Sequence, residues 1–209
     1  MKVFLSLAVL ASVCIVATSA RAFSDNRAGP TVVVARETPM VIICREVSGA
    51  YSLSPTYFGQ LSRYADTRYR VAGGFFGIYP VDPDAVSSAG QLKWLVAQQV
   101  IGGTALGLGS SALPRRYSAS EAVAVLRGLP PARNPYKLLI IPEQTVALIR
   151  STIGRAGMDG LSMYPWMARN GYVQVGPTRM EFLATTGSPS AIPVRIIVPI
   201  KRRPSRLKI

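Results

Sequence analysis

One order of secondary-structure elements occurs twice in this chain, and that repeat restricts the fold more than any other feature of the sequence. Residues 38–101 predict a strand, a helix and two further strands, and residues 137–200 predict the same order. The two segments share no obvious residue identity, so the repeat is one of element order and loop position. Two such units can pair their strands into one mostly antiparallel sheet, with both helices on one side and a central cleft between the halves. We therefore expect an α+β fold built as a tandem duplication.

The first half opens on strands and continues into an amphipathic helix. Residues 31–47 are rich in β-branched side chains, and an interruption at Pro39 predicts either one long strand or two short ones. In residues 54–66 the large apolar side chains recur at helical spacing, with Ser54 as the candidate N-cap. This periodicity predicts a helix that buries one face.

Two further strands complete the first half. Gly73 and Gly74 are expected to end the helical region, and residues 75–79 have the composition of a strand. Residues 80–90 contain an Asp-Pro-Asp turn and predict a loop, after which residues 92–101 predict another strand. The first half therefore has the order strand, helix, strand, strand.

A segment rich in Gly, Ala, Ser and Pro, residues 102–136, separates the two halves. One short helix is expected inside it, because Ser118 and Glu121 have the spacing of a capping box and apolar positions follow up to Leu126. The glycine run at residues 102–109 lacks the lysine of a phosphate-binding loop and the strand-helix context of a dinucleotide fold. We therefore interpret the segment as a connector without a nucleotide site.

The second half repeats the order of the first. A strand region broken at Pro142 precedes a helix at residues 158–170, and strands are expected at residues 178–186 and 194–200. Pro165 lies inside the predicted helix, where it either kinks the helix or marks its true start.

Glu181 is the candidate functional group of the second half. It is the one acid inside an otherwise apolar and aromatic strand, in a chain with 24 basic and only 10 acidic residues. Strand alternation places Glu181 on the same face as Arg179 and Leu183, with Phe182 on the opposite face. Two roles are open for this carboxylate: it faces a ligand, or it is a surface acid or a solvated partner of Arg179 or Arg195.

The absence of histidine excludes several classes of chemistry. The chain has no His and two cysteines, Cys14 and Cys44. Without histidine there is no Ser-His-Asp or Cys-His catalytic device, no zinc site of the ordinary ligand type and no His-ligated haem. Cys44 lies in an apolar run and is expected to be a buried, inert thiol. We expect neither a metal nor a cofactor.

The two ends of the chain differ from the domain between them. Residues 1–22 have a positive start, a short apolar core and a small-residue end, which predicts a cleaved secretory signal, with an uncleaved signal anchor as the alternative. Residues 23–36 are interpreted as a leader and residues 202–209 as a basic tail, which leaves residues 37–201 for the domain. The protein is therefore expected to be secreted or periplasmic, or else membrane-anchored, including in the endoplasmic reticulum membrane if it is eukaryotic.

A set of spaced segments follows the profile of a known family. The segments are Gly77-Ile78-Tyr79, Asp82-Pro83-Asp84, Leu92, Gly171-Tyr172, Gly176-Pro177, Glu181-Phe182 and Ile197-Val198-Pro199-Ile200. Together they resemble the GyrI-like small-molecule-binding domain, the effector-binding fold of AraC- and MerR-type multidrug-sensing regulators, which is distantly related to the SOUL haem-binding family. The resemblance implies a tandem strand-helix-strand-strand fold. It also implies a cleft lined by aromatic residues, in which one carboxylate meets cationic or electron-poor ligands.

The resemblance maps that carboxylate onto Glu181. A carboxylate beside aromatic faces attracts a desolvated organic cation through both its charge and the ring quadrupole. The expected ligand-binding residues are Glu181, Trp94, Tyr79, Trp166, Tyr164, Tyr57 and Phe58. The alternative for each aromatic residue is a place in the hydrophobic core.

We expect an exported small-molecule-binding protein that holds a cationic or aromatic ligand in this cleft. One alternative is a hydrolase of strained electrophilic small molecules, in which Glu181 orients or activates water. Another is a membrane-anchored adaptor that uses the fold as an interaction surface. No helix-turn-helix, zinc-finger or RNP pattern is present, so no nucleic-acid partner is expected, whereas the basic tail suits contact with a membrane surface.

Overall fold

The structure is a computed structural model that describes residues 30–50, 54–80, 92–103, 114–184 and 188–204. The predicted signal segment and most of the predicted loop at 80–90 and of the glycine run at 102–109 lie outside these residues. Within the described part of the chain, no helix has the length and apolar character needed to span a membrane.

The described residues form nine β-strands and three α-helices, which confirms the α+β class. The strands are β1 (Val33–Glu37), β2 (Met40–Ser48), β3 (Tyr69–Tyr79), β4 (Lys93–Gly103), β5 (Tyr136–Ile141), β6 (Gln144–Thr152), β7 (Tyr172–Gln174), β8 (Thr178–Phe182) and β9 (Pro193–Arg202). The helices are α1 (Ser54–Asp66), α2 (Ala119–Gly128) and α3 (Ala156–Arg169), and a short 3-10 turn, η4 (Pro189–Ala191), precedes β9.

The strand order confirms the tandem duplication. The strands pair antiparallel in the order β1-β6-β9-β8-β3-β4-β2-β5, and β7 pairs with β9. The first unit is β2-α1-β3-β4 and the second contains β6, α3, β8 and β9, with β7 as an addition. The two units meet where β3 pairs with β8. The order of strands is therefore symmetrical about the β3–β8 pair.

The strand that precedes each unit pairs with the other unit. β1 leads into β2 but pairs with β6, and β5 leads into β6 but pairs with β2. The β1–β2 and β5–β6 connections run side by side, because Glu37 is opposite Gln144 and Met40 is opposite Ile141. An ion pair between Arg36 and Glu143 joins them. This exchange of strands ties the two halves to each other.

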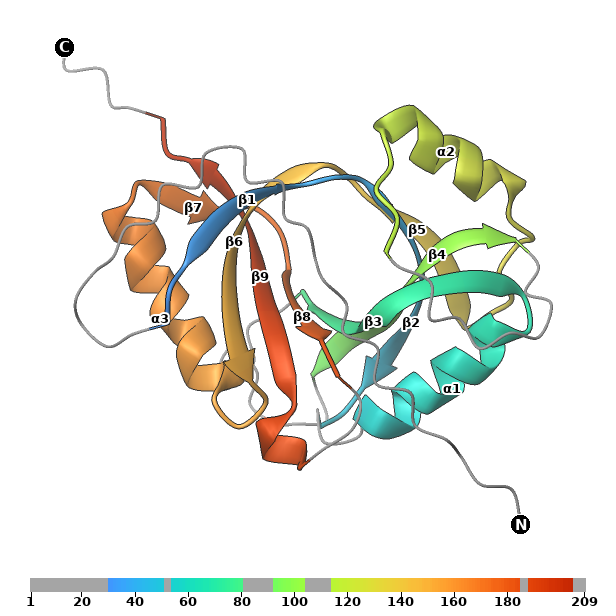
Figure 1. The fold of residues 1–209 in the computed structure, drawn as a ribbon, viewed down its shortest axis with the longest axis horizontal. Helices are drawn as coiled ribbons and strands as arrows, with labels where there is room; N and C mark the ends of the chain where they lie inside the picture. The colour runs from blue at the N-terminus through green and yellow to red at the C-terminus, as the bar shows by residue number, and fades with distance from the viewer. Residues whose placement is uncertain (1–29, 51–53, 81–91, 104–113, 185–187, 205–209) are drawn as a thin grey trace.

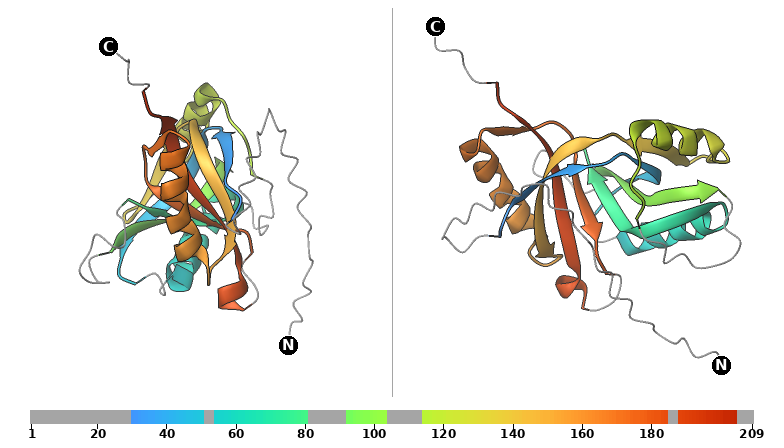
Figure 2. Two further views of the ribbon diagram at one scale, coloured as in Figure 1. Left: turned by 90° about the vertical axis from the view of Figure 1, so that its left-hand side faces the viewer. Right: turned by 45° about the horizontal axis from the view of Figure 1, so that its top comes forward.

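The helices lie outside a strongly curved sheet, as Figure 1 shows. α1 packs on β2, β3 and β4, whereas α3 packs on β6, β7 and β9. Figure 2 shows α3 covering the strands of the second half from the outside. We call the side of the sheet that the helices cover the outer face, and the opposite, concave side the inner face. Both repeated helices lie on the outer face, as predicted.

Because side chains alternate along a strand, many of the large apolar side chains lie on the outer face. Along β4, Trp94 and Val96 point outward and are fully buried in the same cluster as Leu61 of α1. In the second half, Met163 of α3 packs in a cluster with Ile196 of β9. Burial of this apolar area is the main term that holds the helices on the sheet.

Gly73 and Gly74 lie within a strand instead of ending an element, which corrects the sequence-based boundary. β3 runs through both residues, with a φ of 68° at Gly73 and a shift of register against β4 between Ala72 and Phe75. These are the features of a β-bulge, which bends a strand without ending it. Glycine suits the bulge because it adopts a positive φ without a steric penalty.

Other boundaries also differ from the prediction. β1 and β2 confirm the two short strands predicted within residues 31–47, and β1, which pairs with β6, begins at Val33, inside the segment interpreted as a leader. β9 extends to Arg202, inside the predicted tail, because the short strand β7 pairs with its end. β8 ends at Phe182 and is shorter than expected. α3 begins at Ala156, so Pro165 lies in its interior and does not mark its start.

The helix inside the connector is confirmed together with its cap. The backbone N–H of Glu121 donates to the side-chain oxygen of Ser118, and the Glu121 carboxylate accepts from the backbone N–H of Ser118 at 2.7 Å. These hydrogen bonds hold the pKa of Glu121 below its ordinary value. The capping box therefore fixes the start of α2.

Candidate functional site

A small pocket lies on the inner face where the two halves meet. Its volume is about 100 Å³, and strands from both halves contribute to its lining. The side chains that define its chemistry are Glu37, Met40, Phe76, Arg179, Glu181 and Arg195. The predicted site residue Glu181 thus lines a pocket between the halves.

Two ion pairs connect strands across the pocket. Arg179 of β8 donates a hydrogen bond from Nη2 to the carboxylate of Glu37 in β1. Arg195 of β9 forms an ion pair with Glu181 of β8, which is its opposite residue in the β8–β9 ladder. The formal charges of these four residues cancel. A charged ligand therefore has to exchange with one of the existing partners.

The two ion pairs differ in their exposure to solvent. The side chains of Arg179 and Glu37 are 4% and 14% exposed, whereas those of Arg195 and Glu181 are 32% and 19% exposed. Breaking a desolvated pair leaves an uncompensated buried charge, whereas a partly exposed guanidinium can turn toward water. Glu181 is therefore the carboxylate that can exchange its partner, and Glu37 is the one that is fixed.

Phe76 provides an aromatic side chain beside Glu181. The two residues are directly opposite each other in the β3–β8 ladder, and both line the pocket. Side chains in opposite positions of an antiparallel pair lie close enough to act on the same bound group. The combination of carboxylate and ring that the resemblance implied is therefore present, but it is made with an aromatic residue that the sequence did not single out.

The glycine bulge of β3 shapes the wall next to Glu181. Gly73 and Gly74 both line the pocket. A Cβ atom on Gly74 would lie 2.2 Å from the carbonyl oxygen of Phe182, which is too close for any other residue. The missing side chain therefore lets β3 approach β8 directly beside the Glu181 carboxylate.

Four of the six predicted aromatic residues lie behind the pocket, on the outer face. Trp94 is fully buried, and Tyr79 stacks on it with ring centroids 5.9 Å apart. Tyr57 and Phe58 of α1 meet the Trp94 ring edge-on at 6.1 Å and 6.4 Å. These four aromatic residues therefore belong to the hydrophobic core, which was the alternative to a place in the cleft.

Trp166 and Tyr164 lie on α3 and do not line the pocket either. The Trp166 ring stacks on that of Tyr172 at 5.8 Å, and Tyr164 is 41% exposed. The structure therefore corrects the expectation that one cleft gathers all seven residues. The physical reason is that the helices cover only the outer face, so aromatic side chains that pack on helices point away from Glu181.

Three further residues line the pocket without matching any of the predicted site residues: Glu37, Phe76 and Gln99. Gln99 is buried and donates a hydrogen bond to the carbonyl oxygen of Arg115 at 2.6 Å. A signal for Gln99 existed, because it is a polar residue inside an apolar strand. Glu37 gives no such signal, since its partner Arg179 is 142 residues away in the chain.

Cys44 is a buried thiol on the inner face, as predicted. Burial raises its pKa from 9.0 to about 11, and the positive charge of Lys137 opposes that rise. At neutral pH the thiol stays protonated and is a poor nucleophile. The structure therefore confirms that the cysteine is buried, and its inertness stays a prediction.

Solved structures share this fold, although no family profile and no curated protein sequence matches the chain. The crystal structure of the EcmrR C-terminal domain aligns with a TM-score of 0.59 and 8% identity, over 82% of this chain and 97% of that one. EcmrR in its complex with DNA aligns with a TM-score of 0.57 and 10% identity, and the match spans 82% of this chain and only 57% of that one. A hydrolase encoded by lin2189 from Listeria innocua aligns at 0.52 with 11% identity, over 83% and 93%.

These likenesses confirm the fold that the sequence resemblance implied. The chain shares the fold of the EcmrR C-terminal domain, and this agrees with the GyrI-like fold that the resemblance implied. Because the sequence identities are only 8% and 11%, these similarities concern the fold alone.

Proposed function

We propose that the inner-face pocket binds the cationic head group of a small organic molecule. The observation that carries this proposal is the position of Glu181, which lies opposite Phe76 and pairs with the partly exposed Arg195. A cation between a carboxylate and an aromatic ring gains from the charge of one and the quadrupole of the other. The GyrI-like fold of the chain is consistent with small-molecule binding.

The volume of the pocket limits the size of the head group. An apolar cavity of about 150 Å³ is known to hold one benzene molecule, and this pocket measures about 100 Å³. An ammonium or guanidinium group fits that space, whereas an aromatic ring requires the walls to move. The geometry therefore favours the cationic ligand over the aromatic ligand of the sequence-based hypothesis.

Arg195 is the group that the ligand replaces. Its side chain is 32% exposed, so its guanidinium can turn toward solvent when another cation occupies the place beside Glu181. The Arg179–Glu37 pair is more deeply buried and stays intact. Binding is then the exchange of one cation for another at the same carboxylate.

The site requires no particular compartment, so this proposal is independent of the export predicted from residues 1–22.

Titration calorimetry with choline and its neutral isostere 3,3-dimethylbutan-1-ol tests the proposal. We expect choline to bind and the isostere not to bind. Glu181→Gln should weaken choline binding by about tenfold or more, whereas Arg195→Gln should strengthen it, because that variant lacks the internal competitor. These opposite effects separate a role in binding from a general loss of structure.

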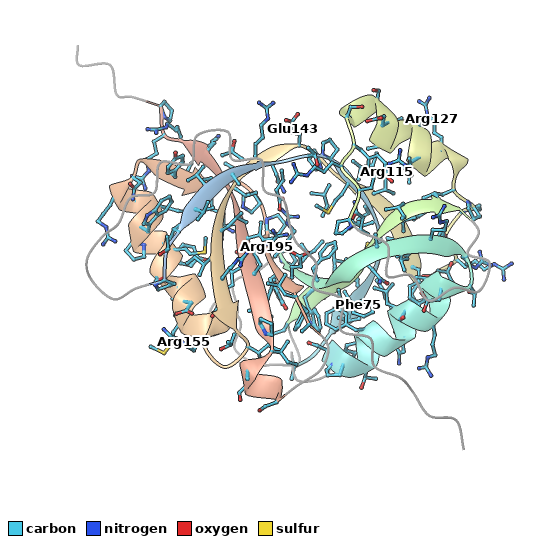
Figure 3. All side chains as sticks on the ribbon, in the orientation of Figure 1. Phe75, Arg115, Arg127, Glu143, Arg155 and Arg195 are labelled. Atoms are coloured by element: carbon cyan, nitrogen blue, oxygen red, sulfur yellow. The ribbon has the colours of Figure 1, made fainter. Side chains whose placement is uncertain are left out.

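Glu143→Gln is the matched control for both variants. It breaks the exposed Arg36–Glu143 ion pair, and Figure 3 shows Glu143 at the edge of the molecule, whereas Arg195 lies near its centre. We expect choline binding to stay unchanged in this variant. Equal affinity for choline and its isostere, or unchanged affinity in Glu181→Gln, would contradict the proposal.

A further inference from the structure

α3 carries large apolar side chains on two opposite sides. Its inward side packs Met163 and Met167 into the core of the second half. Its outward side exposes Met158, Leu161 and Tyr164, which are 81%, 53% and 41% accessible to solvent. Residues three positions apart are neighbours on a helix surface, so these side chains form one stripe instead of isolated exposed residues. We call them the α3 stripe.

Basic residues flank the α3 stripe at both ends of the helix. Arg155 precedes the first turn and Arg169 ends the last turn, and both side chains are exposed. Figure 3 shows Arg155 at the end of the helix opposite to β7. The acid in α3, Asp159, is buried toward the sheet, where it accepts hydrogen bonds from the Ser151 hydroxyl at 2.6 Å and from Nη2 of Arg155 at 3.5 Å, while the Arg155 side chain stays 72% exposed. The exposed side of α3 therefore has basic residues and no acidic one.

The end of β9 adds further positive charge at the C-terminal end of α3. The backbone N–H of Arg203 donates to the carbonyl oxygen of Gly171, two residues after the helix, at 2.8 Å. The guanidinium of Arg202 lies 5.1 Å from the centre of the Tyr172 ring. Figure 1 shows β7 and the end of β9 next to this end of the helix. Arg169, Arg202 and Arg203 thus lie near the C-terminal end of the helix that carries the α3 stripe.

We propose that the α3 stripe docks on an anionic membrane surface. Helices that bind in the plane of a membrane combine exposed apolar side chains with flanking Lys or Arg residues, which contact the lipid phosphates. The long Arg side chains can place their charge at the head groups while their stems follow the apolar surface. This contact extends the membrane role expected of the basic tail to a defined helix face. It is independent of the proposed pocket function, because the pocket lies on the inner face.

The charge pattern favours a lipid surface over a second copy of this chain. In a symmetrical contact between two α3 stripes, Arg155 and Arg169 of each copy would meet a surface of the same sign. The chain as a whole has 24 basic and 10 acidic residues, so it offers few acidic patches to complement that face. An anionic bilayer provides both the negative charge and an apolar layer below it.

A tryptophan placed in the stripe tests this proposal in the full chain. Leu161→Trp puts the reporter at an exposed position in vesicles that contain brominated lipid, and its signal is the quenching in excess of that of the unchanged chain, which already contains Trp94 and Trp166. We expect quenching in vesicles of phosphatidylglycerol mixed with phosphatidylcholine, less quenching in phosphatidylcholine alone, and a decrease as salt is added. This excess quenching reports the depth of residue 161, so insertion of the apolar N-terminal segment into a vesicle does not mimic it.

Val123→Trp provides the matched control, because Val123 is also an exposed apolar residue on the outward side of a helix, α2. This reporter should show little quenching in the same vesicles. Adding Met158→Ser to Leu161→Trp should lower the partition onto anionic vesicles by about tenfold, since it removes one large apolar side chain from the contact. Adding Arg169→Gln to Leu161→Trp should weaken binding to anionic vesicles only.

Several results would overturn the proposal. Absence of quenching at residue 161, or equal quenching at residues 161 and 123, shows that α3 does not face the bilayer. A dimer that dissociates on Met158→Ser in the absence of lipid assigns the stripe to a protein contact. Loss of all quenching on deletion of residues 204–209 assigns the membrane contact to the tail and not to α3.

Discussion

Along β8, Glu181 points to the inner face of the sheet, and the next residue, Phe182, points to the outer face and packs on Phe58 of α1. The same alternation occurs in β3, where Phe76 lines the pocket and Phe75 stacks on Phe58. Neighbouring residues of one strand therefore belong to two different environments. One is an aromatic core under helices, and the other is a pocket that contains two ion pairs.

This difference separates the residues that hold the fold together from those that are available for recognition. Helices cover the outer face, so its large side chains can be buried completely, as Trp94 is. The pocket on the inner face holds charged side chains that keep part of their exposure, such as Arg195. Substitutions on the outer face should therefore change stability, whereas those at the partly exposed Glu181 and Arg195 of the inner face should change binding.

Trp94→Ala should have the largest effect on stability, because it removes a fully buried ring from the outer core. We expect the free energy of unfolding to fall by about 3–5 kcal/mol, measured by urea denaturation. In the fraction that remains folded, choline affinity should stay close to that of the unchanged protein. A loss of stability below about 1 kcal/mol would show that the outer core is not the main stabilising cluster.

Glu37→Gln and Glu181→Gln compare the two ion pairs within the inner face. Glu37→Gln leaves Arg179 buried without its carboxylate and should cost about 3 kcal/mol of stability, whereas Glu181→Gln should cost less than about 1 kcal/mol. Urea denaturation of both proteins gives the two values. Combining Glu37→Leu with Arg179→Met should recover most of the loss, because no unpaired charge is then buried. Equal losses in the two single variants would mean that the difference in burial does not set the cost of losing the carboxylate.

Cys44 should have the smallest effect at neutral pH and a clear effect only in alkali. Its pKa is about 11 in the folded protein against 9.0 for an ordinary thiol, so the unfolded chain loses its proton first as the pH rises. Stability should therefore be independent of this group well below pH 9.0 and should fall between 9.0 and about 11. The difference between the protein and Cys44→Ala in urea denaturation across this pH range measures it. Iodoacetamide labelling, mapped by mass spectrometry, should modify Cys44 at pH 8 only after denaturation.

Much of the fold could be predicted from the sequence because its signals are local. The helical spacing of residues 54–66, the capping pattern at Ser118 and the apolar strand at 92–101 correspond to α1, α2 and β4. The short strand β7 gave no such signal, because its pairing with the end of β9 is a tertiary contact. From the sequence, the pair Gly73-Gly74 predicts the end of an element, because a β-bulge and the end of an element have the same local composition.

Within the candidate site, the sequence by itself determined that Glu181 and Arg179 share one face of a strand, because side-chain alternation in a strand is a local property. Only the tertiary structure decided which face that is. The helices occupy the outer face and bury Trp94, Tyr79, Tyr57 and Phe58 there, and the strand exchange brings Glu37 to Arg179. Contacts between residues so distant in the chain depend on how the two halves pair, and local periodicity does not encode that pairing.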